Sequence, residues 1–298
     1  MSLPKSHMLK AYRLATLPCR RWLHKRLQRL GQVPVTGLFL HRVADDYPND
    51  WSISIETFDE ILDWLQANVD LVSIDEAQRR IRDGNHDRLA VNISFDDGYA
   101  DNCLHAIPTL IARRIPFTYY VTTHHVAHGK PFPHDLKLGQ PLSPNSVEEI
   151  RAMAEAGVEI GVHTRTHPDL GQVRIQRDLN YELLGAREDL TNWIGSRPRH
   201  FAFPFGLPHN MTPRAIQFLH DEGFESYASA HGGYKFPTSS GFHLRRFNAD
   251  PNLERVKNWL SLDPRWVYER PQYEYVPIHR TPAFRPIPSP TTSDQGNA

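Results

Sequence analysis

The chain of 298 residues lacks several features that would assign it to a class of protein. It has only two cysteines, Cys19 and Cys103, which excludes a disulfide framework, so the protein does not need an oxidising compartment. Lys and Arg together number 34, as do Asp and Glu, so no excess of one charge indicates nucleic acid or an acidic partner. No internal repeat or interior linker is visible, and the apolar fraction of 40% supports a real core.

Long apolar runs and acidic residues are both missing near the N-terminus. Residues 1–30 contain eight Lys and Arg residues, and the first acid is Asp45. A secretion signal needs an apolar stretch of about 7 to 15 residues, but charges and Pro18 interrupt every run here. No run is long enough for a transmembrane helix either. We therefore expect a cytoplasmic protein.

Residues 1–33 are expected to form a basic helical extension. Leu23, Leu27 and Leu30 recur at helical spacing beside Trp22, which is typical of a basic amphipathic helix. Such a helix would allow peripheral contact of residues 1–30 with the anionic inner surface of a membrane. The alternative is a helix packed on the domain with its charges in water.

The most informative stretch is residues 91–99, Val-Asn-Ile-Ser-Phe-Asp-Asp-Gly-Tyr, where an apolar run ends in two adjacent carboxylates. Unpaired buried charges are costly to desolvate, so Asp96 and Asp97 need partners or a metal. A second apolar run ends at His163, and His167 follows four residues later. Asp97 with the two imidazoles would make a divalent metal site, and Asp96 would then accept a proton.

Strand and helix patterns alternate through residues 34–270. Strands are predicted at residues 35–43, 89–95 and 117–121, among others, with helices between them. This alternation indicates a single α/β domain, a distorted or incomplete TIM-like (β/α) barrel of about seven strands. Residues 124–144 are rich in Pro, Gly and His and are predicted to be a long loop that shapes a substrate groove.

The candidate site residues fit this barrel, because each follows a predicted strand at the rim where such barrels place chemistry. These residues are His41, Asp96, Asp97, His163 and Pro204. Beyond the barrel, residues 271–298 are rich in proline and are expected to be largely disordered.

Three segments resemble motifs of the polysaccharide deacetylases, the NodB-homology or carbohydrate esterase family 4 enzymes. Residues 94–98, Ser-Phe-Asp-Asp-Gly, are similar to the first motif, usually Thr-Phe-Asp-Asp-Gly. Residues 163–168, His-Thr-Arg-Thr-His-Pro, resemble the second motif, and 201–206, Phe-Ala-Phe-Pro-Phe-Gly, a variant third. The resemblance covers about residues 35–250. It implies a hydrolase that removes N-acetyl groups from amino sugars of a bacterial polysaccharide or glycan precursor.

The resemblance also implies a role for each matching residue. Asp96 would be the catalytic base, while Asp97, His163 and His167 would bind the metal, most commonly Zn²⁺. The carbohydrate would be contacted by third-motif residues and by a late arginine: Pro204, Phe205, Gly206 and Arg246. Aromatic side chains near the same rim could stack on sugar rings: Tyr99, Phe132, Phe203 and Phe205.

The chain departs from the family pattern at two points. Many members carry an Arg that orients the base where this chain has Ala202, and Arg245 or Arg246 could substitute for it. A convincing late Leu-x-His motif, which would supply the general acid, is absent. Residues 38–43, Leu-Phe-Leu-His-Arg-Val, instead resemble the start of members acting on bacterial exopolysaccharides. We therefore expect His41 to be the acid, with His243 as the alternative.

Two other functions stay open from the sequence. A 2-His-1-carboxylate iron enzyme uses the same ligand types, but it leaves Asp96 unexplained and usually has antiparallel sheets. A catalytically inactive carbohydrate-binding protein on the same scaffold agrees with Ala202, although such a protein has no use for a base at Asp96. The sequence predicts neither the glycan nor the oligomeric state.

Overall fold

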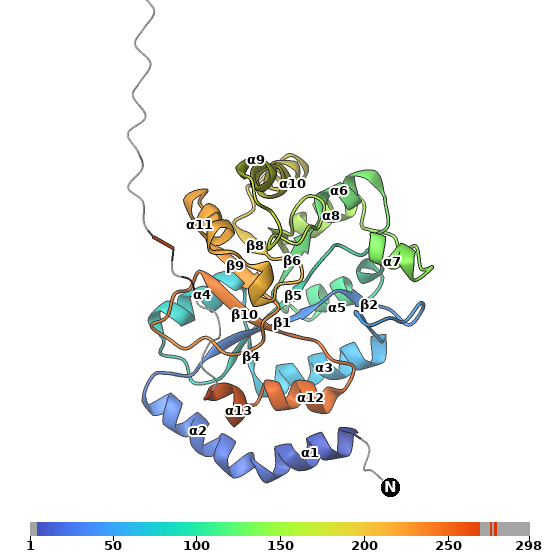
Figure 1. Cartoon of the computed structure of the whole chain (residues 1–298). Helices are drawn as coiled ribbons and strands as arrows, with labels where there is room; N and C mark the ends of the chain where they lie inside the picture. Colours follow the sequence, from blue (N-terminus) through green and yellow to red (C-terminus); the bar gives the residue numbers. More distant parts are fainter. Residues whose placement is uncertain (1–4, 269–274, 276, 279–298) are drawn as a thin grey trace, which may run out of the picture.

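Parallel strands close into a barrel in the computed structural model of the protein, which describes residues 5–268, 275 and 277–278 (Figure 1). In order around the barrel, the seven strands are β1 (Val35–Leu40), β5 (Ala90–Phe95), β6 (Phe117–Val121), β7 (Glu159–Val162), β8 (His200–Ala202), β9 (Ser226–Ser229) and β10 (His243–Asn248). Strand β1 pairs with both β5 and β10, which closes the ring. The predicted α/β barrel of about seven strands is thereby confirmed.

Three short strands lie outside this ring. Strand β4 (Asp70–Leu71) pairs with the first residues of β5, while β2 (Arg42–Val43) pairs with β3 (Ser52–Ile53) beyond the end of β1. The predicted strand over 35–43 is therefore interrupted at His41. The break follows from Arg42, whose buried guanidinium bonds to Asp46 and Asp101 and so directs the chain away from the barrel.

Helices cover the outside of the barrel, so most strand residues are buried on both faces, as expected for parallel strands. Those around the barrel are α3 (Ile55–Asn68), α4 (Ile74–Asp83), α5 (Ala106–Ala112), α8 (Val147–Glu155), α9 (Gln176–Leu179), α10 (Ala186–Ile194), α11 (Pro213–Asp221), α12 (Leu253–Trp259) and α13 (Pro264–Val267). Two 3₁₀ turns, η1 (Ala100–Cys103) and η3 (Pro208–Asn210), and a π-helical segment, η2 (Asn180–Gly185), complete them. Local sequence sets the start of α8, where Ser146 and Glu149 form a capping box.

Residues 124–144 are not the continuous loop that the sequence predicted. They include the end of helix α6 (Thr123–His128) and helix α7 (Pro133–Lys137). Gly129 ends α6 in the left-handed conformation, and Pro133 occupies the first turn of α7. Short helices bounded in this way carry too few residues to show a periodic pattern.

Helices α1 (Lys5–Ala15) and α2 (Leu17–Arg29) occupy the segment expected to be a basic helical extension. They lie along one side of the molecule against α12 and α13 (Figure 1). The buried Arg20 guanidinium donates to the Asn258 side chain and backbone and to Ser261. No helix of the described residues is long and apolar enough to cross a membrane.

Most of the predicted disordered tail, residues 271–298, lies outside the described residues. Within it, the Tyr275 hydroxyl and the Ile278 backbone N–H both donate to the Gln217 side chain of α11.

Candidate active site

The two neighbouring acids follow β5 directly and sit where the strand turns away from the barrel. The Asp96 N–H still donates to the carbonyl of Leu40 on β1, at 2.9 Å, so this residue keeps the strand's path. Asp97 then takes a left-handed backbone, φ 73°, and Gly98 follows at φ 100°. This turn lets two consecutive carboxylates face one pocket, because alternation along a strand would have separated them.

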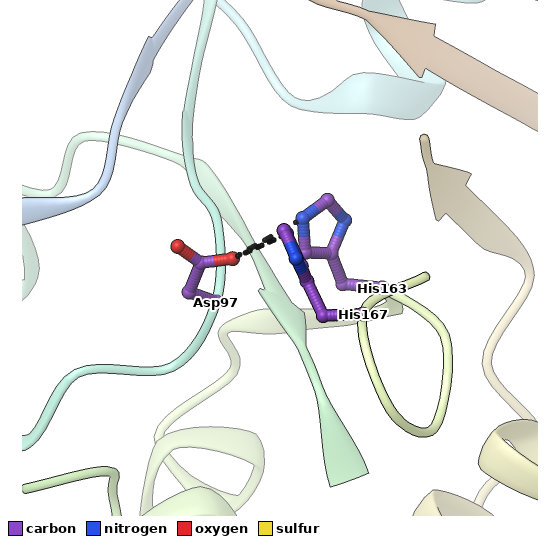
Figure 2. Close-up of side chains that lie close together, drawn as sticks. All are labelled: Asp97, His163 and His167. Atoms are coloured by element: carbon purple, nitrogen blue, oxygen red, sulfur yellow. Dashed lines mark ion pairs between the residues drawn. The ribbon is translucent and has the colours of Figure 1, made fainter. Parts of the chain in front are cut away.

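One oxygen of Asp97 faces both histidines (Figure 2). The Oδ1 atom lies 3.3 Å from Nε2 of His163, which follows β7, and 3.2 Å from Nε2 of His167 in the next loop. All three side chains are largely buried. The predicted set of Asp97, His163 and His167 is thus brought together from segments 66 positions apart.

Hydrogen bonding orients the first of these imidazoles. Nδ1 of His163 lies 2.8 Å from the carbonyl oxygen of Ala202 on β8, so Nε2 faces Asp97. Burial opposes a charged imidazole, but the nearby carboxylates of Asp97 and Asp96 raise the pKa of His163. Burial likewise opposes ionisation of Asp97, yet the two histidines hold its pKa well below the ordinary value.

The same three residues fit a divalent cation. Their ligand atoms lie within 4.8 Å of one another, and two imidazoles with one carboxylate are a usual donor set for such ions. Oδ1 of Asp97 is buried and has no hydrogen-bond partner in the described part of the chain. A buried carboxylate oxygen without a donor is costly, and a bound cation would remove that cost.

The loop that carries His167 is held by a buried acid that the sequence did not reveal. Glu182, in the π-helical segment η2, accepts the backbone N–H groups of Arg165 and Thr166 at 3.0 and 2.9 Å. Its other oxygen accepts the Thr166 hydroxyl at 2.6 Å. His167 itself has φ 61°, a conformation that needs such support. Glu182 therefore fixes the turn between the two histidines.

The carboxylate of the other acid, Asp96, is held by Arg246, which lies 150 positions later in the chain. The Arg246 guanidinium donates to both carboxylate oxygens, at 2.7 and 2.8 Å, and the pair is buried. The same guanidinium bonds to Ser94 and to the Ser229 carbonyl. Burial alone would raise the pKa of Asp96, but Arg246 and His163 outweigh it and lower that pKa. Asp96 is thus an oriented, ionised carboxylate.

Arg246 can contact Asp96 because of the pairing register between β10 and β1, the two strands that close the barrel. It pairs with Gly37 on β1, and a Cβ atom at Gly37 would lie only 2.5 Å from the arginine side chain. The guanidinium stacks over Phe39, 4.6 Å from the ring centre. A glycine inside a predicted strand was the sequence signal that a neighbouring side chain crosses there.

A cavity of about 340 Å³ opens beside these groups. Its lining residues are Phe39, His41, Trp51, Asp96, Asp97, His134, His163, His167, Phe203, Phe205 and Ala230. The predicted acid His41 is therefore on the cavity, and burial lowers its pKa. The alternative, His243, starts β10 and is not among the lining residues. Its buried imidazole contacts the Ser229 hydroxyl at 2.8 Å.

The predicted carbohydrate contacts are only partly on the cavity. Phe205 lines it, is 56% exposed, and lies edge-on to His167. Pro204 and Gly206 are buried and do not line it. Gly206 is needed for packing, because a Cβ atom there would come within 2.4 Å of the Ala230 nitrogen. Arg246 is also buried, so its donors serve Asp96 and not a bound sugar.

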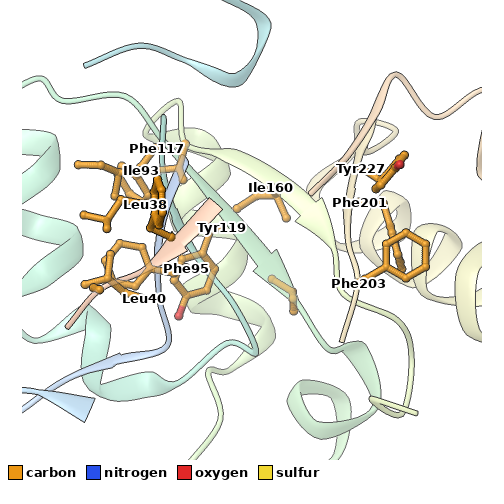
Figure 3. Packing of buried hydrophobic residues seen from close by; sticks show 14 of the residues in the cluster. Leu38, Leu40, Ile93, Phe95, Phe117, Tyr119, Ile160, Phe201, Phe203 and Tyr227 are labelled. Atoms are coloured by element: carbon orange, nitrogen blue, oxygen red, sulfur yellow. The ribbon is translucent and has the colours of Figure 1, made fainter. Parts of the chain in front are cut away.

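Three of the four predicted stacking aromatics are buried. Tyr99 and Phe132 pack with Leu142 in a separate apolar cluster. Phe203 has its ring against Phe201 and Tyr227 in the core (Figure 3), although one edge reaches the cavity. Stacking on a sugar therefore falls to Phe205 among the four.

The sequence did not predict two of the residues that line the cavity, Trp51 and His134. Their rings pack edge to face, 4.9 Å apart, across the cavity wall. Nε2 of His134 lies 2.9 Å from the Tyr99 hydroxyl, which donates to Asp135 at 3.0 Å. Burial raises the pKa of Asp135 to about 6. Trp51 lies in a turn and His134 in the short helix α7, and neither segment is long enough for periodicity to indicate which way a side chain points.

A second group of metal-ligand types lies at the other end of the barrel and differs in kind. It combines Asp75, Glu225 and His200, the first residue of β8. The Arg199 guanidinium pairs there with both of those carboxylates and with Glu159. These acids already pair with an arginine, whereas Asp97 pairs only with two imidazoles among the described residues.

Comparisons with known proteins agree with this geometry. A family profile described as polysaccharide deacetylase matches residues 83–225. A chitooligosaccharide deacetylase of Bradyrhizobium sp. (strain ANU 289) is 29% identical over 119 residues, which span 40% of this chain and 47% of that protein. The chain thus covers about half the length of this relative.

Solved structures show the same fold over most of the chain. IcaB from Ammonifex degensii superposes with a TM-score of 0.64 at 25% identity, covering 76% of this chain and 97% of that one. The Streptococcus pyogenes deacetylase PplD superposes with a TM-score of 0.65 at 19% identity, covering 77% and 99%. With the first two motifs placed at one site, the profile match identifies residues 83–225 as a polysaccharide deacetylase domain, and the solved structures share its fold.

Proposed function

We propose that the protein is a metal-dependent hydrolase that removes N-acetyl groups from the amino sugars of a bacterial polysaccharide or glycan precursor. The observation that carries the proposal is the pairing of two differently held carboxylates. Asp97 presents an oxygen without a hydrogen-bond donor to His163 and His167, whereas Asp96 is fixed by Arg246. One acid is thus suited to an ion and the other to proton transfer.

The metal site would be formed by Asp97, His163 and His167, and Zn²⁺ suits these donors best. When bound, the ion would polarise the amide carbonyl and lower the pKa of a water molecule to about 7. The carbonyl of Ala202 keeps His163 in the orientation that ligation requires.

Asp96 would take the proton from the attacking water. Its pKa is lowered, so it is ionised at neutral pH and ready to accept. The bidentate contact with Arg246 limits rotation of the carboxylate and aims it at the cavity. The water oxygen adds to the acyl carbon, the carbon–nitrogen bond breaks, and acetate and a free amine leave.

The amine needs a proton as it leaves, and His41 would supply it. It lies on the same cavity as Asp96, with its Nδ1 buried and without a hydrogen-bond partner in the described residues. Because burial lowers its pKa, the alkaline limb of the rate profile should start below about pH 6.5. His41→Ala should remove that limb and leave metal content unchanged.

The carbohydrate substrate is supported by the family and by the shape of the cavity. The Bradyrhizobium relative is named for chitooligosaccharides, and PplD was solved with acetate. The exposed ring of Phe205 beside His167 gives a sugar an apolar face to stack on.

The two rival functions are less compatible with these contacts. An inactive binding protein would not need Arg246 to hold a base, and that arginine removes the objection raised by Ala202. An iron oxygenase would leave the Asp96–Arg246 pair without a role, and the sheet is parallel, not antiparallel.

The test is acetate release from a panel of N-acetylated glycans, with metal analysis of the purified protein. We expect about one divalent ion per chain and acetate release that Asp96→Asn slows by about 10² to 10⁴ while the ion stays bound. Acetate release at the wild-type rate by Asp96→Asn would refute the proposed mechanism.

A further inference from the structure

The outer face of α1 and α2 carries side chains that the barrel does not use. The inner face packs on the domain: Leu23 is part of the main core, and Arg20 bonds to Asn258. Hydrogen bonds from Thr16 to Tyr12 and from Arg20 to Thr16 carry the helical path from α1 into α2. The two helices therefore follow one another directly, with a bend between them, and the far side of this helix pair faces away from the molecule (Figure 1).

The helix pair α1 and α2 is strongly basic. It holds eight of the 34 basic residues and none of the 34 acidic ones, which leaves the rest of the chain negative by eight. Arg13 pairs with Glu254, and Arg20 lies 3.7 Å from Asp263. The other six are exposed and have no ion pair with any described residue: Lys5, Lys10, Arg21, Lys25, Arg26 and Arg29.

Apolar side chains run along the same face. Trp22 is 53% exposed and Leu30 is 61% exposed, and Met8 and Leu14 are exposed to a similar degree. Spacings of three and four residues place a line of small and large apolar residues on the outer face of the helix pair: Met8, Ala11, Ala15, Pro18 and Trp22. The Arg26 guanidinium lies over the Trp22 ring, 5.2 Å from its centre.

We propose that this outer face docks the protein on an anionic phospholipid membrane. Basic residues beside an exposed tryptophan and aliphatic side chains are the pattern that binds lipid headgroups and inserts shallowly below them. A nucleic acid would use the charges but leave the apolar line exposed to water. A second copy of this face would bring like charges together. The helices stay packed on α12 and α13 in this docking, so no unfolding is needed.

The probe is flotation of the full chain with vesicles of phosphatidylcholine alone or mixed with phosphatidylglycerol. We expect binding to the mixed vesicles only, weakening as salt is raised, because screening acts over about 10 Å at 0.1 M salt. The double variant Lys25→Gln, Arg26→Gln should lower the partition coefficient about 30-fold, because each basic residue near an anionic surface raises that coefficient by about fivefold.

Two further variants separate lipid from other polyanions. Trp22→Ser should weaken vesicle binding about tenfold, whereas Trp22→Phe should retain binding and lose the fluorescence quenching caused by brominated acyl chains. The matched controls are Arg177→Gln and Leu104→Ser, at positions with 88% and 82% exposure far along the chain from this face. Equal thermal midpoints would show that all variants fold.

Three results would overturn the proposal: equal binding to neutral and anionic vesicles, binding unaltered by the Lys25 and Arg26 changes, or no binding at low salt. Binding to single-stranded RNA that survives Trp22→Ser, without vesicle binding, would assign the face to nucleic acid. Acetate release plays no part in these readouts, so the deacetylase proposal stands or falls separately.

Discussion

At the scale of single residues, the site depends on one buried ion pair. Asp96 and Arg246 meet in a bidentate contact with no exposure to water for the arginine. Breaking a buried pair by removing one partner leaves an uncompensated charge, which typically costs about 3 to 5 kcal/mol. The pair therefore joins the stability of the barrel to the orientation of the base.

Arg246→Met should lower both kcat and the free energy of unfolding. The lost cation had lowered the pKa of Asp96, so the acid limb of the rate profile should move to higher pH. In the wild type, a carboxyl with a lowered folded pKa contributes stability above its unfolded pKa of about 3.9 and loses it as pH falls further. The difference in unfolding free energy between wild type and variant should thus shrink in acid.

Arg246→Lys is the control, because it keeps the charge and removes the two-pronged contact. It should retain more stability than Arg246→Met and still lose turnover. A rate profile that does not move in either variant would show that Arg246 does not orient the base.

The two neighbouring acids should respond differently to the same substitution. Asp96→Asn keeps the shape and removes the proton acceptor, so turnover should fall by about 10² to 10⁴ with the metal retained. Asp97→Asn should release the metal, and added zinc should restore part of the activity. Turnover assays and metal analysis of both variants check this, and reversed phenotypes would exchange the two roles.

At the scale of elements, the π-helical segment η2 has a defined task. Its wide turn places Glu182 under the loop between the two histidines, where it accepts three hydrogen bonds. Residues that orient metal ligands usually contribute about 10-fold to 100-fold in affinity. Glu182 acts on the ion only through the backbone and hydroxyl of its neighbours.

Glu182→Ala should therefore weaken metal binding by about 10-fold to 100-fold and leave the intrinsic role of Asp96 intact. Competition with a chelator measures the affinity, and excess metal should rescue turnover. Glu188→Ala, at an exposed position on α10, is the control. Wild-type affinity in the Glu182 variant would mean that the loop holds its shape without that carboxylate.

The sequence predicted what is local and left open what depends on register, such as whether Arg245 or Arg246 orients Asp96. Asp96, Asp97, His163 and His167 each follow an apolar run, so strand ends could be read directly. The contact of Arg246 with Asp96 requires β10 to pair with β1 and β1 with β5, a relation between distant segments. Periodicity fixes which residues are buried but not which strands become neighbours.

Irregular segments were the other source of error. The segment with His134 contains short helices. Strand β1 ends at Leu40, earlier than expected, because Arg42 pairs with acids outside the barrel. Pro204 and Gly206 were expected to face the sugar, but the turn buries them and exposes Phe205. In a tight turn, sequence proximity to a motif does not determine the direction of a side chain.

At the scale of the whole molecule, metal binding should stabilise the fold. A ligand present at 100 times its dissociation constant adds about 2.7 kcal/mol to the free energy of unfolding. Zinc should thus raise the thermal midpoint of the wild type and leave that of His163→Ala unchanged. Calorimetry with and without chelator measures both, and an equal shift in the variant would place the ion elsewhere.

The same stabilisation should depend on pH. Burial opposes the charged form of His163, but its carboxylate neighbours raise its pKa. A proton therefore competes with the ion for this imidazole at higher pH than for an ordinary histidine. Metal affinity should therefore increase from about pH 6 to about pH 8. Chelator-buffered titrations across this range test it, and a flat profile would mean that His163 is neutral before the ion binds.

The closing seam of the barrel also sets an order of events during synthesis. The three proposed metal ligands all emerge by residue 167, whereas Arg246 lies 150 positions after Asp96 and arrives with the last strand of the ring. A nascent chain that stops before β10 holds the complete ligand set and an unaligned base. Competence for hydrolysis would then appear only when the ring closes, so a truncated chain could capture an ion without being able to cleave an amide.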